Sequence, residues 1–369
     1  MTKVSFIMTP DLGGGPRNVY MLTKLLNKRG NSCKILSPYI DYKNNLGSDS
    51  WMLKSSGKYM SYVNKHLIQF NSVDYINYPL FFLKNCLLDP WSIKRYSNFD
   101  VYVSTAWPTV YTGRILSKIN RKPLLYFVQA YETTLGYRNP KLYKKLVDAT
   151  YKMNLPMFTQ SKWLKDYFRE KFSLNVEWIG LGINHEKFYE KRVKKKKQIY
   201  TVARLEYDKG FDVFVEAMNL LWKERKDIKI VISGTRKALT NKSINFEYEF
   251  LDWINDDDLL SNLYAESVFV NTGRREAIPM PPLEAMACGS PIVISDMGGA
   301  QEYAFNNKNS LVCNINEPAS FSYAVQSILD NEDLRIRLSK NAVETAKAYD
   351  WNNVIERLSL FLEKVNVNF

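Results

Sequence analysis

Two cations stand close together in residues 203–210, which read ARLEYDKG. Arg204 follows a β-rich run directly, and Lys209 comes five residues later. Doubly wound sheets bind ligands at the carboxyl ends of their strands, and two cations there can neutralise a diphosphate. The same residues could instead form a solvated basic loop. This segment alone does not separate the two interpretations.

Two carboxylates occur in residues 273–289, which read GRREAIPMPPLEAMACG. The prolines fit the first turn of a short helix that Gly289 caps, so we expect Glu284 in that turn and Glu276 on the loop before it. Carboxylates accept hydrogen bonds from sugar and ribose hydroxyls, and a helix N-terminus suits phosphate. Alternatively, Glu284 is an acidic residue favoured by the helix dipole.

A third segment, DLGGGP at residues 11–16, lies between the first predicted strand and the first predicted helix. Its glycines would let a ligand approach the backbone, and the helix N-terminus would offer N–H groups to an anion. The G-x-G-x-x-G spacing is absent, which disfavours a nicotinamide cofactor. A structural tight turn is the alternative.

The elements that must position these segments alternate between β-rich runs and amphipathic helices, which predicts parallel strands joined by helical crossovers. A helix is predicted over Pro16–Arg29, with Gly30 ending it. No structure is assigned to residues 38–98. The strands predicted in the first half are Val4–Met8, Cys33–Ser37, Val101–Thr105, Leu124–Gln129, Met157–Gln160 and Val176–Ile179.

The alternation restarts after a charged stretch at residues 186–198, which is typical of a linker. The second half predicts strands at Ile199–Arg204, Ile228–Gly234, Tyr248–Leu251, Val268–Asn271, Pro291–Ser295 and Leu311–Asn314. Helices are predicted near Phe211–Glu224, Asp257–Glu266, Pro282–Cys288, Pro318–Leu329 and Leu334–Ala348, followed by an amphipathic segment at Trp351–Val365. Two doubly wound α/β domains in series are the simplest architecture.

Composition narrows the class of protein. A chain of 369 residues suggests two domains. The net charge of +13 would suit nucleic acid or an acidic membrane, but the lysines are spread along the chain without a nucleic-acid module. The four cysteines and two histidines lack metal-ligand spacing. No apolar run reaches the ~20 residues of a membrane span, so we expect a cytoplasmic protein, with peripheral contact with the inner membrane face as an open alternative.

Taken together, the segments resemble the retaining glycosyltransferases of family 4, also called glycosyl transferases group 1. The motifs of that family are R-x-x-x-x-K-G, E-G-F-G-x-P-x-L-E-A-M-A-x-G-x-P-V-V and G-G-x-x-E. In the same order, this chain has Arg204–Gly210, Glu276–Val293 and Gly298–Glu302. Weaker similarity at residues 13–15, 159–164 and 179–183 extends the resemblance over most of the chain.

The resemblance implies a GT-B fold, in which two Rossmann-like domains face a central cleft. The acceptor-side domain would span residues 1–185, the linker 186–198 and the nucleotide-sugar-binding domain 199–349. A helix at about residues 350–369 would pack back on the first domain.

The resemblance also implies the site residues. Arg204 and Lys209 would hold the donor diphosphate, Glu284 the ribose hydroxyls, and Glu276 the transferred sugar. Of these, Arg204, Lys209 and Glu276 would be the catalytic group. The remaining donor-binding positions would be Gly14, Gly15, Gly234, Ala277, Ile278, Pro279 and Met280.

Two departures from the family pattern stand out. Ala277-Ile278-Pro279 replaces the usual Gly-Phe-Gly, and proline cannot donate a backbone N–H to the donor. Gln129 stands near the usual position of a histidine in the first domain, a version that looks like the branch with bacterial rhamnosyltransferases. Gln129 can hydrogen-bond a sugar but cannot act as acid or base, and Glu132 becomes a candidate acceptor contact.

The implied reaction is transfer of a sugar from a nucleoside-diphosphate sugar to a hydroxyl of a glycan, a lipid-linked sugar or a protein, with retention of anomeric configuration. No Asp-x-Asp pair suits a divalent metal, so we expect no metal and no cofactor. Three alternatives stay open: an epimerase of the same fold, a non-catalytic sugar-nucleotide or glycan-binding protein, and a nucleic-acid-binding protein.

Overall fold

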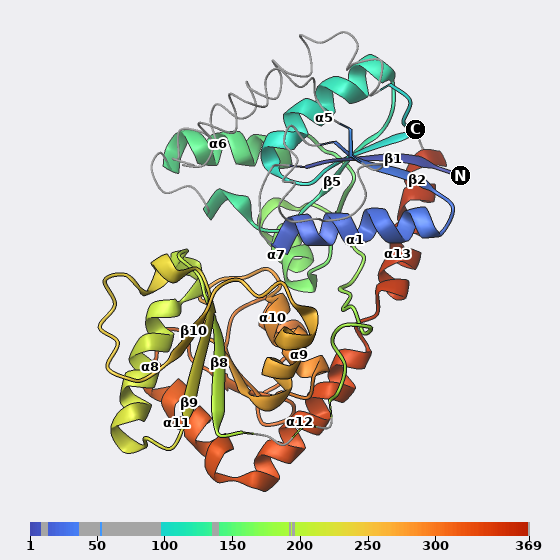
Figure 1. Ribbon diagram of the computed structural model, residues 1–369. Coiled ribbons are helices and arrows are strands. Elements are labelled where there is room, and N and C mark those ends of the chain that lie inside the picture. The colour runs from blue at the N-terminus through green and yellow to red at the C-terminus, as the bar shows by residue number, and fades with distance from the viewer. Residues whose placement is uncertain are drawn as a thin grey trace. The chain divides into compact units, whose positions relative to one another are not determined.

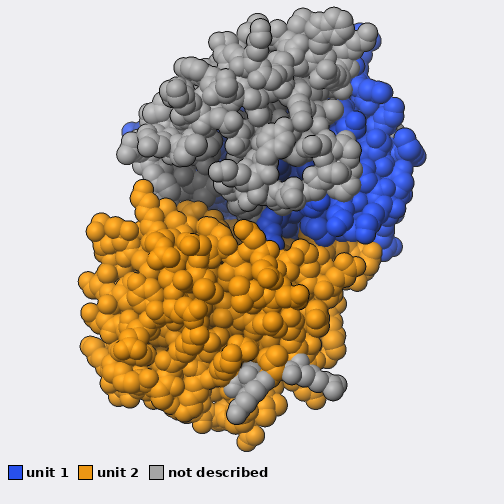
Figure 2. Space-filling model, in the orientation of Figure 1, with its two compact units in different colours: residues 1–160, 164–179, 354–369 blue, residues 161–163, 180–353 orange. Residues whose placement is uncertain are grey.

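The computed structural model describes residues 1–8, 14–36, 52–53, 97–134, 140–191, 193 and 196–367. Most of residues 38–98, to which the sequence assigned no structure, lies outside these ranges. The chain divides into two compact units (Figure 2). Unit 1 comprises residues 1–160, 164–179 and 354–369, and unit 2 comprises residues 161–163 and 180–353.

Unit 1 contains a parallel sheet in the order β3-β2-β1-β4-β5-β6-β7. Figure 1 labels β1, β2 and β5 of this sheet. Its strands are β1 Lys3–Ile7, β2 Ser32–Leu36, β3 Met52–Leu53, β4 Val101–Ser104, β5 Leu124–Phe127, β6 Met157–Thr159 and β7 Val176–Trp178. The helices between them are α1 Gly14–Lys28, α5 Trp107–Asn120, the 3-10 turn η3 Glu132–Thr134, α6 Pro140–Tyr151 and α7 Lys162–Phe172. The central strands β4 and β5 are fully buried, as continuous apolar runs in a parallel sheet require.

Unit 2 contains a second parallel sheet in the order β10-β9-β8-β11-β12-β13. Its strands are β8 Gln198–Ala203, β9 Lys229–Gly234, β10 Glu249–Leu251, β11 Val268–Asn271, β12 Ile292–Ser295 and β13 Leu311–Cys313. Its helical segments are η4 Tyr207–Lys209, α8 Phe211–Glu224, η5 Arg236–Leu239, α9 Asp257–Glu266, α10 Met280–Ala287, η6 Ala300–Glu302, α11 Pro318–Asp330 and α12 Glu332–Lys347. The predicted α/β class and doubly wound topology are confirmed in both units.

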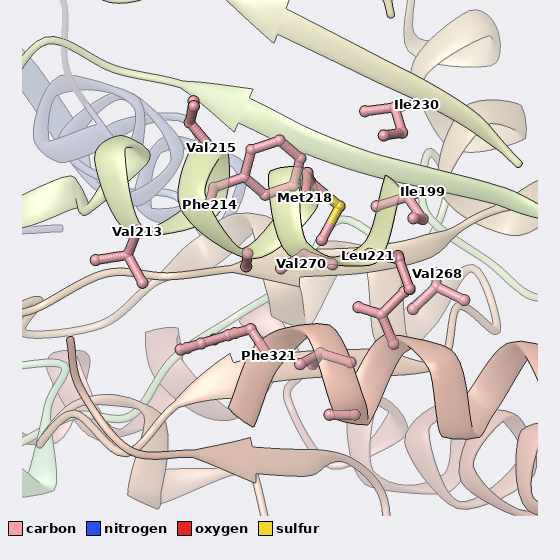
Figure 3. Close-up of a cluster of buried hydrophobic side chains, with 14 of the residues drawn as sticks. Ile199, Val213, Phe214, Val215, Met218, Leu221, Ile230, Val268, Val270 and Phe321 are labelled. Carbon is pink, nitrogen blue, oxygen red and sulfur yellow. The ribbon is translucent and has the colours of Figure 1, made fainter. Parts of the chain in front are cut away.

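The sheet of unit 2 is held by an apolar layer beneath α8 and α11. Phe214 and Met218 of α8 meet Ile199 and Val270 of the sheet, and α11 contributes Phe321 (Figure 3). All five side chains are at most 1% exposed. Burying a side chain of this size stabilises the fold by about 1.5–3 kcal/mol, so this layer makes a rigid base for the loops at the sheet edge.

The last helix, α13 Trp351–Val367, begins in unit 2 and is part of unit 1 from Val354 onward. Within unit 1, the ring of Phe361 lies 5.8 Å from that of Phe158, and the guanidinium of Arg357 lies 4.3 Å from the ring of Trp178. None of the helices in the described ranges is long and apolar enough to cross a bilayer.

Candidate functional site

The site in unit 2 lies where the chain reverses direction across the sheet. Strand β8 has β9 on one side and β11 on the other, and the chain leaves β8 to build β9 and β10 before it returns to β11. Open parallel sheets bind ligands outside the carboxyl ends of the two strands at such a switch point. Arg204 directly follows β8, and the loop to Glu276 follows β11.

Arg204 is held in place by two contacts. Its guanidinium donates to the carboxylate of Glu206 at 3.0 Å and lies 5.3 Å from the ring centre of Trp253. Burial alone would raise the pKa of Glu206, but the hydrogen bond and charge of Arg204 outweigh it and hold that pKa below its usual value. The Arg204 side chain keeps 28% of its surface exposed, so it can also reach a ligand.

Lys209 forms an ion pair with Glu276, the third residue of the predicted catalytic group. Its Nζ lies 2.5 Å from Oε2 of Glu276, and the two side chains are 30% and 9% exposed. The structure therefore joins the loop after β8 to the loop after β11 through opposite charges. Lys209 and Glu276 stand 67 positions apart in the chain.

Gly210 permits the close approach of those two loops. Its φ of +64° is left-handed, and a Cβ atom there would lie 1.9 Å from the carbonyl oxygen of Thr272. The Thr272 hydroxyl donates to the Gly210 carbonyl at 2.8 Å. Only glycine satisfies both the dihedral angle and the space.

Arg274, a residue that the sequence did not single out, ties the same loops together. Its guanidinium donates to both carboxylate oxygens of Asp212, at 2.8 and 2.7 Å. The backbone N–H of Arg274 donates to the Asp208 carbonyl at 2.8 Å. The Arg274 hydrogen bond, and then its charge, lower the pKa of Asp212. Arg274 stands two residues before Glu276, and this position is the one signal in the sequence that could have identified it. Its bidentate pair with Asp212 forms only in the folded protein, so the sequence does not show it.

Two backbone carbonyls of Ala277-Ile278-Pro279 accept hydrogen bonds from side chains of other segments. The Ala277 carbonyl accepts from the Ser161 hydroxyl at 2.9 Å, and the Pro279 carbonyl accepts from the Tyr303 hydroxyl at 2.5 Å. Pro279 is the N-cap of α10, and Met280 is its first residue. Ile278 and Met280 pack partly buried against the apolar core. The unusual tripeptide is thus an ordered loop.

Gly299 lies against the same loop. Its N–H donates to the Glu276 carbonyl at 3.2 Å, and an added Cβ would lie 2.1 Å from the Ala277 carbonyl oxygen. This glycine belongs to the G-G-x-x-E segment, so that motif supports the loop that carries Glu276.

Glu284 does not lie in the first turn of α10, contrary to the prediction. The helix starts at Met280, because Pro281 and Pro282 occupy positions whose N–H groups have no acceptor inside a helix. Glu284 therefore falls in the second turn and is 7% exposed. Its negative charge adds to burial in raising the pKa of Tyr200, whose hydroxyl lies 2.6 Å from that of Ser233.

Gly234, at the end of β9, has a φ of +111°, and a Cβ atom there would lie 2.5 Å from the Ala203 carbonyl oxygen. It therefore lies beside the end of β8, next to Arg204. The structure brings Arg204, Gly234, Lys209 and Glu276 to one edge of the unit 2 sheet, with Glu284 on the helix that follows.

In unit 1, Gly14 and Gly15 begin α1 instead of forming the loop before it. Residues 9–13 lie outside the described ranges. A Cβ on Gly15 would lie 3.1 Å from Oε1 of Gln129, so two predicted positions meet. Nε2 of Gln129 donates to the Thr105 carbonyl at 3.0 Å, while its buried Oε1 has no hydrogen-bond partner among the described residues.

Glu132 is bound to unit 1 itself. Its Oε2 accepts from the N–H of Trp107 at 2.9 Å, at the start of α5, and from the hydroxyl of Tyr126. Burial raises the pKa of Glu132 to about 7, against the lowering effect of these two hydrogen bonds. This side chain thus caps α5, and its predicted contact with the acceptor stays a prediction.

No group of three or more His, Cys, Asp or Glu side chains in the described part of the chain could hold a metal ion. Asp256 caps α9 by accepting from the N–H groups of Asp258 and Leu259, as expected for an acidic helix start.

The part of the chain that carries these residues resembles known proteins. The family model described as glycosyl transferases group 1 matches residues 183–345, most of unit 2. The chain is 28% identical over 301 residues to an uncharacterised glycosyltransferase of Methanocaldococcus jannaschii, covering 73% of this chain and 75% of that protein. The protein is a glycosyltransferase. It is also 28% identical over 208 residues to the N,N'-diacetylbacillosaminyl-diphospho-undecaprenol alpha-1,3-N-acetylgalactosaminyltransferase of Campylobacter jejuni, which covers 51% of this chain and 54% of that enzyme. The chain thus spans about half the length of this second relative.

Two solved structures share the fold of this glycosyltransferase. Sucrose-phosphate synthase from Thermosynechococcus elongatus matches with a TM-score of 0.81 at 15% identity, over 100% of both chains. HepE of Anabaena, solved with UDP and glucose, matches with a TM-score of 0.77 at 14% identity, over 99% of this chain and 100% of that one. The predicted GT-B fold is confirmed.

Proposed function

We propose that this glycosyltransferase takes its sugar from a nucleoside-diphosphate sugar that binds at the sheet edge of unit 2. The observation that carries the proposal is the pair of cations, Arg204 and Lys209, at the switch point between β8 and β11. HepE of Anabaena has also been solved in complex with UDP-glucose, which supports the same donor class.

The chemistry follows from the charge that develops at the leaving group. As the bond from the anomeric carbon to the diphosphate breaks, negative charge grows on the departing oxygen. Arg204 and Lys209 are fixed in advance, so they stabilise this charge without reorganising. Removing one strong electrostatic contact of this kind typically lowers the rate by about a hundredfold or more.

Glu276 and Glu284 would bind hydroxyl groups, since ionised carboxylates accept hydrogen bonds. Glu276 holds Lys209 at 2.5 Å, so it also orients that cation toward the ligand. We assign Glu276 to the transferred sugar and Glu284 to the ribose.

We further propose that the reaction retains the anomeric configuration and requires no metal. The acceptor hydroxyl would attack from the face that the diphosphate leaves, forming the new C–O bond as the old one breaks, and its proton would pass to a diphosphate oxygen. No enzymic base is then needed, and the two cations neutralise the leaving group in place of a metal.

In this proposal, the acceptor is a hydroxyl group of a glycan, a lipid-linked sugar or a protein. The Campylobacter relative is named for a diphospho-undecaprenol-linked acceptor, which supports the lipid-linked class. Gln129 and Glu132 are the acceptor-side candidates in unit 1. A cytoplasmic location, peripheral contact with an acidic membrane and membership of the rhamnosyltransferase branch remain predictions.

A panel of nucleotide sugars tests the proposal. The purified protein is incubated with each donor, and nucleoside diphosphate release is measured with and without candidate acceptors. We expect release with at least one donor, at a rate that the acceptor raises. An altered sugar with no diphosphate release would indicate an epimerase, and no turnover of any donor would contradict a catalytic role.

A further inference from the structure

The side chain of Arg274 is bound on nearly every side by unit 2 itself. It is 10% exposed. Its guanidinium donates two hydrogen bonds to the Asp212 carboxylate, one to the Tyr207 carbonyl at 2.8 Å and one to Oδ1 of Asn316. A guanidinium has five N–H groups, so one remains. Arg274 therefore cannot form the two parallel hydrogen bonds with which arginine binds a phosphate.

The charge of Arg274 is also matched within the fold. The hydrogen bonds to Asp212 are the main cause that raises the pKa of Arg274, and the same bonds lower the pKa of Asp212. Both side chains thus stay ionised and neutralise each other. Arg274 is a cation of the fold and not a third free cation for the donor.

The partners of Arg274 lie on both sides of Lys209 in the chain. The carbonyls of Tyr207 and Asp208 come directly before Lys209. The first accepts from the guanidinium, and the second accepts from the backbone N–H of Arg274 at 2.8 Å. Asp212 comes three residues after Lys209, in the first turn of α8. One residue of the loop after β11 thereby bonds to the chain before and after Lys209.

The segment that carries Lys209 needs such contacts. It is the 3-10 turn η4, and a single turn of this kind has weak hydrogen bonds of its own. None of the three residues of η4 is buried, so the apolar core does not fix their position. The ring of Tyr207 instead lies 4.0 Å from the guanidinium of Arg274.

A third loop joins the same guanidinium. Asn316 stands between β13 and α11 with a φ of +62°, a left-handed conformation that asparagine adopts more readily than most residues. Its Oδ1 accepts from Nε of Arg274. Arg274 therefore links the loops that follow β8, β11 and β13 at one edge of the sheet.

We propose that Arg274 is a positioning residue for sugar transfer, which holds Lys209 where negative charge develops on the departing diphosphate. Arg274 itself does not bind the donor. A cation stabilises a transition state best when it is fixed in advance, and a misplacement of about 1 Å can cost about a hundredfold in rate. The inference rests on the proposed function, because it requires that Lys209 serves the donor.

A double-mutant cycle tests the role of Arg274. Nucleoside diphosphate release from the preferred donor gives the turnover number of the wild type, Arg274→Gln, Lys209→Met and the double variant. We expect Arg274→Gln to lower turnover about tenfold or more in the wild type, but less than about twofold once Lys209 is replaced. A loss that came only from a weaker fold would be the same in both backgrounds.

Arg225 provides a matched control at the opposite end of α8. Its side chain is 12% exposed, and it donates to both carboxylate oxygens of Asp227, at 2.9 and 3.0 Å, and to Asp330. Arg225→Gln should destabilise the protein as Arg274→Gln does, but should keep turnover within about twofold of the wild type. Equal losses of turnover in these two variants would overturn the proposal.

Arg274→Lys is the milder variant, should Arg274→Gln fail to fold. It keeps a positive charge beside Asp212 but lacks the planar fork that reaches both carboxylate oxygens. We expect it to retain the thermal midpoint within a few degrees and to lose turnover about tenfold. Wild-type turnover in Arg274→Lys would show that the charge alone suffices and would overturn the positioning role.

The cycle also separates this inference from the proposed function. If Lys209→Met loses turnover and Arg274→Gln then causes its full loss again in that background, the positioning role is overturned and the donor site stands. If Lys209→Met keeps full turnover, the assignment of Lys209 to the donor is wrong, and the positioning role is overturned with it.

Discussion

Lys209 has two roles in the proposed site. Its Nζ is paired with the Glu276 carboxylate at 2.5 Å, and the same cation is assigned to the donor diphosphate. A cation that served only as a structural partner would be dispensable once its carboxylate was neutralised. A cation that binds the ligand would still be required. These two roles can be separated by mutation.

We predict that Lys209→Met lowers turnover by about a hundredfold or more and also destabilises unit 2, because it leaves the nearly buried Glu276 carboxylate without its ion pair. The double variant Lys209→Met/Glu276→Gln should recover the thermal midpoint, but its turnover should stay far below that of the single variant Glu276→Gln. Equal turnover in the double variant and in Glu276→Gln alone would mean that Lys209 has only a structural role.

Glu132 provides a pH-dependent prediction in unit 1. Its pKa is about 7 in the folded protein against an ordinary 4.5. Between these values the folded state keeps a proton that the unfolded state releases, so stability falls as the pH rises through this window. Relative to the wild type, Glu132→Gln should gain up to about 3 kcal/mol in unfolding free energy between pH 4.5 and 8. Urea denaturation across that range measures the difference, and parallel pH profiles would contradict the raised pKa.

At the scale of elements, the alternation of strands and helices was predictable because each apolar run is a buried strand, as β4 and β5 illustrate. The start of α10 was misjudged by two residues, because two prolines fit several early helix positions. The pair of Arg274 with Asp212 could not be predicted, because it joins a loop to helix α8 across 62 positions of the chain, with no sequence pattern to mark it. Motif spacing predicted Arg204, Lys209 and Glu276 as site residues, and the structure has them on the segments that follow β8 and β11.

The loop between η4 and α8 gives a prediction for Gly210. Gly210→Ala should lower the unfolding free energy by more than about 2 kcal/mol, because it adds a clash with the Thr272 carbonyl to the strain of a positive φ. Gly30→Ala is the matched control, since Gly30 also has a positive φ, +83°, but nothing lies within 4 Å of its added Cβ. It should cost about 1 kcal/mol. Similar losses in the two variants, measured by urea denaturation, would exclude close packing at Gly210.

At the scale of the whole molecule, the net positive charge and the proposed donor site fall in different parts of the chain. Residues 1–179 carry the net positive charge, and the group 1 match falls on residues 183–345. The sequence showed the total charge of +13 but not its function, because the pairing of cations in unit 2 depends on the fold. That pairing leaves the donor site with a few cations of defined geometry.

If these cations replace a metal, the enzyme should tolerate chelators. We predict that EDTA in excess changes the turnover number by less than about twofold, and that added Mg²⁺ or Mn²⁺ does not raise it, because Arg204 and Lys209 already neutralise the diphosphate. Initial rates with the preferred donor measure this. Loss of activity with EDTA and recovery with a divalent cation would show that a metal takes part.

The central claim, that Arg204 and Lys209 hold the donor diphosphate, is tested most directly by titration calorimetry with nucleoside diphosphates. The wild type should bind at least one of the uridine, guanosine, thymidine and adenosine diphosphates. Arg204→Ala should weaken that binding at least about tenfold, the expected loss of a charge-assisted contact, without changing the far-ultraviolet spectrum. Equal affinity in the wild type and in Arg204→Ala would contradict the account.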